Sequence, residues 1–548
     1  MSIPDRVSPF LDLVSAPFTL PGSRILVFRD AAVPDALNIR LAEYERDLDD
    51  CVLVRTLRAL DGDGHVAPVS TVHPDRIAFG GTDVTVTFDG PAALSVGGDG
   101  AWSVEVDLPS GDAPTSYSSE DGAVRFSGDG VSRAAAEAHE TALAATTAVW
   151  DEWFARTPTV RDDLADMTAF CWWVLGANIV SLPGRGARAV VPSKIGYVGL
   201  WQWDAYFIAS GLRHGDPELA REQLELAFAY PSADGQLPDV VHDEGVLASS
   251  DDLPPGDREN LRRAGSAIAD PSAPIPLTKP PLAAWALRRL EGFVDDPAFF
   301  DRAWEVVARS QEWWFAHSDL DGDGMPEYGH PYSSGLDDSP VFDAELPVAS
   351  PDLAAYLILQ DDLLAARARS VGDAAGAARY AARASRTLGL LEGMWDDASG
   401  YFRSSGAGTP IAAETAVSLL PLLTGRLPGR YVTGIVAALS DPDRFATTWS
   451  VPTVAHRDAH YSDERMWRGP VWVNVNALLA EGLAVSGHAS RARELIEETL
   501  RLVIHGGGPQ EYFNPATGEK ARTATTAFGW SAALFVDLAV AVSPAAPI

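Results

Sequence analysis

From residue 159 to residue 548 the chain is a succession of segments with helical periodicity, and this pattern limits the fold more than any other feature. Apolar residues recur every three to four positions in segments that are cut by loops rich in Gly, Pro and Asp. These segments are 164–180, 217–230, 281–293, 299–317, 351–371, 374–395, 412–423, 473–487, 489–506 and 528–542. So many alternating helices do not fit a small bundle, and one or two more are expected in the loops. We predict an (α/α)6 barrel, in which six helical hairpins form an inner and an outer ring and long loops at one end build a pocket.

The first 130 residues follow a different pattern. Between residues 24 and 126, short runs rich in Val, Thr and Phe alternate with Asp-Gly and Gly-rich turns, which is typical of antiparallel strands. Residues 131–158 are a run of good helix formers. We therefore expect a mainly α protein with an N-terminal antiparallel β-sandwich-like domain (1–130), a helical linker (131–158) and an (α/α)6-barrel domain (159–548) that would carry out the chemistry.

The composition excludes several classes of function. With 42 Lys and Arg against 76 Asp and Glu, the net charge is −34, which excludes a general electrostatic grip on nucleic acid or an anionic membrane. The two cysteines, Cys51 and Cys171, exclude a disulfide framework and a cysteine-based metal centre. The N-terminus has no basic region followed by an apolar core, and no stretch of sequence is apolar enough for a membrane helix. A cytoplasmic location is therefore expected. The one unusual excess is of tryptophan, with 16 residues.

Four loop segments hold aromatic and polar residues that helix packing does not require. In the first, Trp201, Trp203 and Asp204 stand at the start of a helix. Asp204 is expected to be either a helix N-cap or part of a sugar site, where a tryptophan face stacks on the ring and a carboxylate accepts from two hydroxyls.

The second segment, residues 318–343, has two parts. Asp319, Asp321 and Asp323, followed by a glycine and later by Glu327, copy the first half of a calcium loop. His330 stands where an EF-hand has Glu, so a solvated acidic turn and a metal site remain equal alternatives.

The other part of this segment places Asp337 and Asp338 on a loop bounded by Gly335 and Pro340. This pair is expected to be either a turn with an N-cap or a pair of functional carboxylates.

The third and fourth segments complete the set. Trp467 and Arg468 enter a helix and are followed by Trp472, and Arg468 is expected either to bind substrate or merely to neutralise a carboxylate. Glu511 follows three consecutive glycines, and Trp530 begins the last helical segment.

Carboxylates far apart in sequence therefore all fall in loops at helix starts, interleaved with Trp and Tyr. Glycosidic cleavage needs two carboxyl groups in different environments, one protonated to assist the leaving oxygen and the other charged to activate water or attack the sugar. A serine hydrolase is less favoured because the G-x-S-x-G elbow is missing from the sequence, and no Walker or dinucleotide motif follows a predicted strand.

Taken in order, these loops resemble glycoside hydrolase family 63, in particular its small bacterial mannosylglycerate and glucosylglycerate hydrolases and its α-glucosidases, and more distantly the trehalases of family 37. The resemblance covers residues 160–545. The motifs that carry it are Trp203-Asp204, Lys279-Pro280-Pro281, Asp321-Gly322-Asp323-Gly324, Ser334-Gly335-Leu336-Asp337-Asp338-Ser339-Pro340, Trp467-Arg468-Gly469-Pro470-Val471-Trp472, Glu511-Tyr512-Phe513-Asn514-Pro515 and Phe528-Gly529-Trp530.

The resemblance implies an inverting enzyme, with Asp337 as the general acid and Glu511 as the general base. Asp338 stands where the family usually has Asn, which leaves open which of the two aspartates is the acid, and position favours Asp337. Inversion would place the carboxyl groups of Asp337 and Glu511 about 6.5–9.5 Å apart. The expected sugar-binding residues are Trp201, Trp203, Asp204, Lys279, Asp338, Trp467, Arg468, Trp472 and Trp530.

The leading hypothesis is an inverting hydrolase that removes an α-linked glucosyl or mannosyl residue from a small saccharide or glycoside. The alternatives are an (α/α)6-barrel epimerase or lyase, which would use His or Tyr, and a non-catalytic carbohydrate-binding protein. No cofactor is expected to be required, and the candidate metal ligands Asp319, Asp321, Asp323 and Glu327 would hold a structural calcium ion. A small saccharide or glycoside is the only partner expected, with neither nucleic acid nor membrane, and no oligomeric state is indicated by the sequence.

Overall fold

The computed structural model describes residues 2–33, 35–109, 111, 113–253 and 273–544. The chain forms two compact units. The first contains Met1–Gly199 with Thr525–Ala532 and Ser543–Ile548, and the second contains Leu200–Ala524 with Ala533–Val542.

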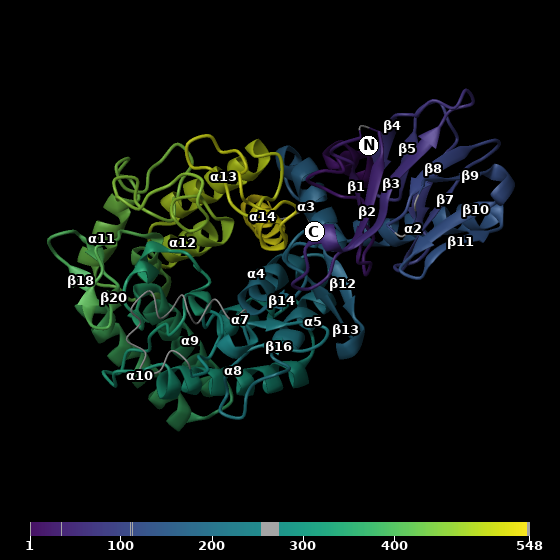
Figure 1. Ribbon diagram of the computed structural model, residues 1–548. Coiled ribbons are helices and arrows are strands. Elements are labelled where there is room, and N and C mark those ends of the chain that lie inside the picture. Colours follow the sequence, from purple (N-terminus) through teal and green to yellow (C-terminus); the bar gives the residue numbers. More distant parts are fainter. Residues whose placement is uncertain (1, 34, 110, 112, 254–272, 545–548) are drawn as a thin grey trace. The chain divides into compact units, whose positions relative to one another are not determined.

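Two antiparallel sheets make up most of the first unit (Figure 1). One sheet has the strand order β1-β2-β3-β8-β9 and the other has the order β11-β10-β7-β6-β5-β4. Along β8 the buried and partly exposed residues alternate, as expected of a sheet with one face in a core. The predicted antiparallel β structure is confirmed. The strands are β1 (Ile25–Arg29), β2 (Leu37–Leu41), β3 (Val52–Leu60), β4 (Val69–His73), β5 (Arg76–Phe79), β6 (Thr85–Phe88), β7 (Ala93–Gly97), β8 (Ser103–Asp107), β9 (Thr115–Ser118), β10 (Ala123–Ser127) and β11 (Gly130–Ala134).

The helices of the first unit are joined by stacked aromatic rings. Trp153 on α2 (Ala136–Phe154) and Trp172 on α3 (Ala165–Ala177) stack with ring centroids 4.8 Å apart. Each indole N–H donates to the other residue's backbone carbonyl, at 2.8 and 3.0 Å. Both side chains are buried, so part of the tryptophan excess belongs to this core and not to a binding surface. The short elements of this unit are α1 (Ile3–Val7), β12 (Ile179–Leu182) and β13 (Ala187–Val190).

The second unit alternates helices that are largely buried with helices that bury only one side. Figure 1 shows α4, α7, α9 and α12 around the middle of this unit and α8, α10, α11 and α13 outside them. Every residue of α4 is buried, whereas the following helix α5 is an amphipathic helix. This alternation of inner and outer helices is that of the predicted (α/α)6 barrel. The inner helices are α4 (Gln202–Leu212), α7 (Ala283–Leu290), α9 (Pro351–Ser370) and α12 (Val473–Val485), and the outer helices are α5 (Pro217–Ala227), α8 (Pro297–His317), α10 (Ala374–Gly393), α11 (Gly429–Ala438) and α13 (Ala489–His505). The last helix is α14 (Gly529–Val542).

One helical segment differs from the prediction. The segment 412–423 forms two short 3-10 helices, Ala416–Ser418 and Leu420–Thr424, and not an α-helix. Pro421 has no N–H for an α-helical hydrogen bond, and Gly425 ends the segment in a left-handed conformation. Helix α11 is one of the additional helices expected in the loops, and its glycines and β-branched residues give it a low helix propensity.

Successive hairpins run up and down, so the inner helices are parallel and their N-terminal ends gather at one end of the barrel. The loops that lead into α4, α7, α9 and α12 are the ones that carry the candidate residues. Short strands brace them: β14 (Leu200–Trp201), β15 (Val240–Val241), β16 (Val246–Leu247), β17 (Val348–Ala349), β18 (Trp395–Asp396), β19 (Tyr401–Phe402), β20 (Ser405–Gly406) and β21 (Thr409–Pro410).

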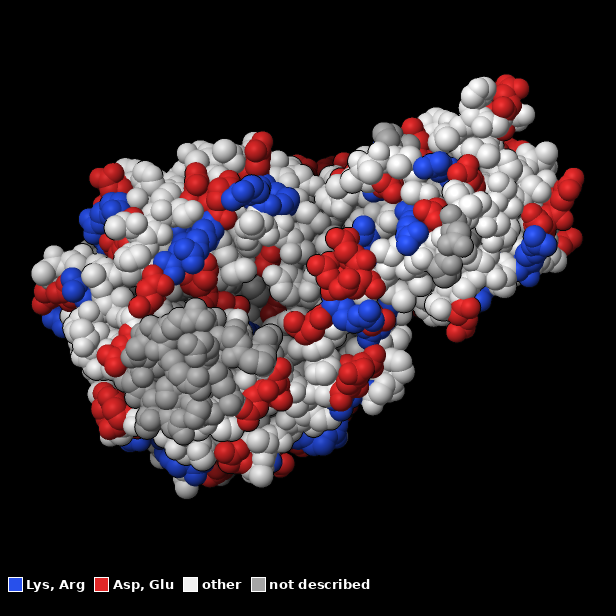
Figure 2. Space-filling view, viewed as in Figure 1, with Lys and Arg blue, Asp and Glu red and all other residues white. Residues whose placement is uncertain are grey.

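The surface agrees with the composition. On the face shown in Figure 2, basic side chains of the described residues are scattered among acidic ones and do not gather into one broad patch. None of the described helices is both long and apolar enough to cross a membrane.

Candidate active site

The side chain of Lys279 lies at the centre of the candidate site. It is buried in the loop before α7, with 5% of its surface exposed. Its Nζ donates to the backbone carbonyl of Tyr332 at 2.7 Å, lies 3.2 Å from Oδ1 of Asp239 and 3.9 Å from Oδ1 of Asp337. One ammonium group therefore joins the loop before α7 to the segment before β15 and to the loop that carries Asp337.

Asp204 belongs to the same cluster. It lies in the first turn of α4, but the N-cap is Trp201, which makes no side-chain capping bond, so Asp204 is not the N-cap. Burial raises the pKa of Asp204 well above its usual range, Lys279 opposes this, and the charges of Asp239 and Asp337 add to it. A buried carboxyl group without a capping role is suited to bind hydroxyl groups.

The adjacent residues Asp337 and Asp338 have opposite environments. Oδ2 of Asp338 lies 3.0 Å from Nε of Arg465, and Oδ1 accepts from the backbone N–H of Trp467 at 2.9 Å. By contrast, Oδ1 of Asp337 is buried without a hydrogen-bond partner, while 38% of the side chain stays exposed. Burial raises the pKa of Asp337, Lys279 lowers it and Asp338 raises it. Asp338 is thus held by cationic and amide donors, whereas Asp337 keeps an oxygen available.

Aromatic rings connect the loops around these carboxylates. Trp467 and Trp472 stack with centroids 3.6 Å apart, and Trp472 lies 4.7 Å from Tyr512. Trp203 contacts Trp467 at 6.4 Å. On its other side Trp203 packs against Gly335, because a Cβ built on that glycine would lie 2.3 Å from the indole ring. The series of rings therefore runs from the start of α4 to the segment of Glu511. Between these ends it includes Trp467, whose backbone N–H binds Asp338.

Glu511 is placed beside this aromatic series by backbone pairing. Val471 and Phe513 form an antiparallel bridge with N–H···O distances of 2.8 and 2.9 Å. Glu511 itself is 4% exposed. Burial raises the pKa of Tyr512 to about 12, and the charges of Glu511 and Asp338 contribute, so both carboxylates lie within electrostatic range of this phenol.

The remaining predicted residues take different places. Arg468 makes two hydrogen bonds to Asp343, at 2.7 and 2.5 Å, and its Nε lies 3.9 Å from Asp338. Trp201 is the partly buried last residue of β14. Trp530 belongs to the first compact unit, where its ring contacts Phe528 at 5.1 Å.

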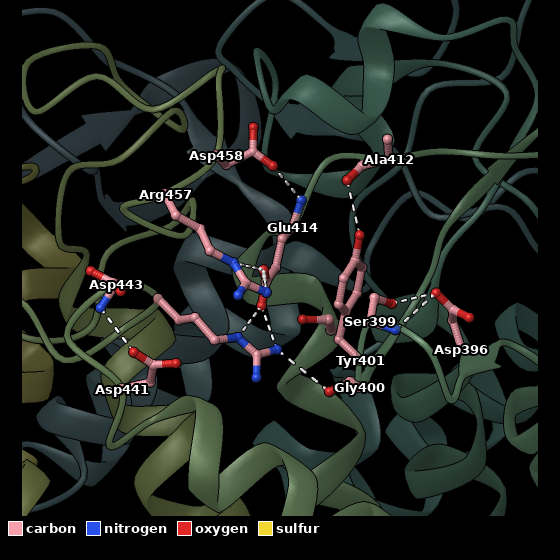
Figure 3. A network of polar contacts seen from close by, with 12 residues as sticks. Asp396, Ser399, Gly400, Tyr401, Ala412, Glu414, Asp441, Asp443, Arg457 and Asp458 are labelled. Atoms are coloured by element: carbon pink, nitrogen blue, oxygen red, sulfur yellow. Dashed lines mark hydrogen bonds and ion pairs between the residues drawn. The ribbon is translucent and has the colours of Figure 1, made fainter.

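The loop that holds Arg465 and Arg468 is fixed at its beginning by a buried ionic network (Figure 3). Glu414 is 3% exposed and is bound by Arg444 and by Arg457, whose Nη2 lies 2.8 Å from Oε2. The backbone N–H of Glu414 donates to Asp458 at 2.7 Å. This network anchors residues 457 and 458 and so limits the movement of the loop that reaches Asp338.

Three carboxylates of the acidic turn lie close together. Oxygens of Asp319, Asp321 and Asp323 all lie within 4.8 Å of one another. Oδ1 of Asp319 is buried without a hydrogen-bond partner. Glu327 is a separate buried group, and burial together with the charge of Asp321 raises its pKa to about 7.

A cavity of about 680 Å³ lies beside this acidic turn and not at the cluster around Lys279. Its lining includes Trp313, Trp314 and Asp321. Among the described residues that line it, Asp204, Asp337 and Glu511 do not occur. Since chemistry requires convergent functional groups and not volume alone, the candidate active site remains the carboxylate cluster.

Sequence reasoning missed Asp239. The residue is 1% exposed and follows Pro238 just before β15. The sequence held one signal. An aspartate directly before an apolar Val-Val pair lies in a segment that folding is expected to bury, and a buried aspartate needs a charged partner. Its partner, Lys279, is 40 residues away and is brought near only by the fold.

Comparison with known proteins places the site in a family context. A family model described as the mannosylglycerate hydrolase MGH1-like glycoside hydrolase domain matches residues 197–531. Mannosylglycerate hydrolase of Thermus thermophilus is 29% identical over 65% of this chain and 98% of its own length. Glucosylglycerate hydrolase of Mycolicibacterium hassiacum is 26% identical over 62% of this chain and 92% of its length.

Solved structures agree with these similarities. A glycoside hydrolase family 63 mannosylglycerate hydrolase of Thermus thermophilus, solved in complex with glucose, aligns with a TM-score of 0.54 at 26% identity, over 67% of this chain and 98% of its own. A bacterial glucoamylase at 12% identity aligns over 95% of this chain and 92% of its own, with a TM-score of 0.54. This second likeness extends the shared fold to the N-terminal β sheets.

Replacement of Gly335 tests the packing between Trp203 and the Asp337 loop. Gly335 has a φ of +69°, and an added Cβ meets the indole of Trp203. Gly335→Ala is expected to lower the free energy of unfolding by about 2–4 kcal/mol, from the backbone conformation and the overpacking together. Urea denaturation followed by tryptophan fluorescence measures the loss.

The matched control is Gly372→Ala. Gly372 has a φ of +81° but no atom within 4 Å of an added Cβ, so only the backbone cost of about 1–2 kcal/mol is expected. Equal losses in the two variants would contradict the close contact with Trp203.

Proposed function

The chain belongs to the mannosylglycerate hydrolase MGH1-like glycoside hydrolases, and from this membership we propose that it is an inverting hydrolase of α-linked glucosyl or mannosyl glycosides. Asp337 is the general acid and Glu511 is the general base in this proposal. The observation that carries it is the contrast between two adjacent aspartates, of which Asp338 is held by Arg465 and Trp467 while Asp337 keeps a buried oxygen without a hydrogen-bond partner.

The acid role of Asp337 follows from its surroundings. A general acid must be protonated before the reaction and must reach the glycosidic oxygen. Burial raises the pKa of Asp337, which favours the protonated form, and the exposed part of the side chain leaves room for a leaving group. Asp338 is bound by an arginine and an amide donor, so both of its oxygens already have partners in the protein.

The base role of Glu511 is supported by its position and its protection from solvent. A base in an inverting enzyme activates one water on the side of the sugar opposite to the acid. Glu511 is buried next to Tyr512, which stacks on the aromatic series that leads back to the Asp338 loop. We propose a separation of about 6.5–9.5 Å between the two carboxyl groups, which admits that water.

The rest of the cluster would bind the sugar. Asp204 supplies a buried carboxyl for hydroxyl groups, and Trp203, Trp467 and Trp472 supply apolar ring surface. Arg468 supplies a cationic donor at the same end of the barrel. The named relatives act on mannosylglycerate and glucosylglycerate, which supports a small glycoside as the substrate. A cytoplasmic location stays a prediction from the sequence.

We also propose that the acidic turn holds a structural calcium ion. Asp319, Asp321 and Asp323 would provide carboxylate oxygens, which are the ligands that calcium prefers, and the unpartnered Oδ1 of Asp319 fits this use. The ion would fix the turn and take no part in the hydrolysis.

Variants of the two carboxylates test the catalytic assignment. Asp337→Asn is expected to lower kcat at least about 100-fold on alkyl α-glucosides or α-mannosides, because the leaving alkoxide needs a proton. The loss should be much smaller on 2,4-dinitrophenyl glycosides, whose leaving group needs none. Glu511→Gln should lose activity on both kinds of substrate, since both require an activated water. Full activity of both variants on alkyl glycosides would refute the assignment.

The stereochemistry of the product tests inversion. Hydrolysis of an α-glycoside should release the β-anomer first, because water attacks the face opposite to the leaving group. Proton NMR of the anomeric signals during the first minutes of reaction distinguishes the two outcomes. Initial release of the α-anomer would show a retaining mechanism.

Thermal denaturation tests the calcium proposal. Calcium that binds the folded state only should raise Tm in a concentration-dependent way, and EDTA should reverse the rise. The rise should be lost in the Asp321→Asn, Asp323→Asn double variant. Glu305→Gln on the exposed side of α8 is the matched control and should keep it. An equal calcium response in the double variant would exclude the turn as the site.

A further inference from the structure

The ammonium group of Lys279 is surrounded by acceptors of the protein itself. A lysine has three N–H donors. The acceptors around Nζ are the carbonyl of Tyr332 at 2.7 Å, the carboxyl of Asp239 at 3.2 Å and the carboxyl of Asp337 at 3.9 Å. The carbonyl accepts a hydrogen bond and the two carboxyl groups attract the ammonium as ion-pair partners, so its charge is directed toward acceptors of the protein.

Gln202 holds the backbone of both Asp239 and Lys279. Gln202 donates its backbone N–H to the carbonyl of Asp239 at 2.9 Å, and its side-chain oxygen accepts from the backbone N–H of Lys279 at 3.2 Å. One residue at the start of α4 therefore holds both members of the ion pair. Asp239 and Lys279 are 1% and 5% exposed, so the pair is rigid and shielded from solvent.

We propose that the buried Asp239–Lys279 pair is a positioning unit for the general acid: Asp239 holds the ammonium of Lys279 against Asp337, and through this charge the pair sets the pH range in which the acid works. This inference rests on the proposed acid role of Asp337. It gives Lys279 a function toward the acid and brings Asp239, which touches neither the sugar nor the scissile bond, into the mechanism.

The charged and titratable groups that face Lys279 come from several loops. Asp204 lies in the first turn of α4, Asp239 before β15, Asp337 before α9 and His330 in the same loop as Asp337. Burial lowers the pKa of His330 to about 4, with a further lowering by Lys279, so this imidazole is neutral during catalysis. Asp338 faces Asp337 from the adjacent position.

The protonation equilibria agree with this geometry. Burial alone would lower the pKa of Lys279, but the nearby carboxylates, with Asp239 first, raise it above its usual value, so Lys279 stays charged. Burial raises the pKa of Asp239 to about 7, and Lys279 opposes that rise. Lys279 likewise lowers the pKa of Asp337, which burial has raised.

The two members of the pair should therefore act on Asp337 in opposite directions. The acid is active when protonated, so its pKa sets the alkaline limb of the pH profile of kcat/KM. Lys279→Met removes a cation near Asp337 and should move this limb about 1–3 pH units upward. Asp239→Asn removes the counterion of Lys279, which then acts more strongly on Asp337, and should move the limb downward by about one unit.

The experiment is the pH dependence of kcat/KM for the full-length wild type, Lys279→Met, Asp239→Asn and the double variant. The probes are methyl and 4-nitrophenyl α-glucoside and α-mannoside. We expect shifts of opposite sign in the single variants. In the double variant we expect the upward shift of Lys279→Met to persist, because Asp239 acts on Asp337 through the ammonium that this variant lacks. Lys279→Arg keeps the charge and should keep the wild-type limb. Thermal denaturation identifies any variant that fails to fold.

A merely structural role would lower activity at every pH and leave the limb in place, and a direct role of Lys279 in sugar binding would raise KM without moving the limb. Either result overturns the inference. If Lys279→Met does not fold, the downward shift in Asp239→Asn and its reversal in the double variant still decide. If the alkaline limb moves in none of the pair variants while Asp337→Asn is inactive on methyl glycosides, this inference alone is overturned. Full activity of Asp337→Asn would overturn the proposed acid.

Discussion

The parallel direction of the inner helices is the constraint on which the candidate site depends. Each inner helix begins at the same end of the barrel, so the loops before α4, α7, α9 and α12 meet although they are far apart in the chain. Asp204 lies in the first turn of α4, and Lys279, Asp337 and Arg468 come from the loops before α7, α9 and α12. The fold thus turns residues that are scattered in sequence into one cluster, and no single loop needs to carry the whole site.

This convergence buries several charges, which is costly unless they compensate one another. Asp204, Asp239 and Asp337 share one buried cation, Lys279, so not all three carboxyl groups can stay ionised at once. The cluster therefore holds protons near neutral pH, which a general acid requires. By contrast, Glu414 has two arginines of its own and serves to anchor a loop. The number of cations for each carboxylate separates a cluster suited to proton transfer from a structural network.

The periodicity of the sequence predicted most helices, because an inner helix needs apolar residues all round and an outer helix needs one apolar face. It failed at 412–423, where a proline forces 3-10 turns, and it left the position of α11 open, where glycines weaken the pattern. The motif positions indicated the site loops, but Asp239 was missed because its partner is identified only by distance. Part of the tryptophan excess lies outside the candidate site, since Trp153 and Trp172 form part of a buried core.

The adjacent pair Asp337 and Asp338 shows why sequence left the acid open. Two identical side chains on one loop differ only in what the rest of the fold brings to them, and the groups that bind Asp338 come from Arg465 and Trp467, which are 127 and 129 residues away. Those contacts hold the side chain of Asp338 in place, and its charge raises the pKa of the neighbouring Asp337. An asparagine at position 338 could bind the same loop but would lack this charge. The second aspartate therefore places a negative charge beside Asp337 that favours the proton of this carboxyl group, while the opposing charge of Lys279 keeps that proton transferable.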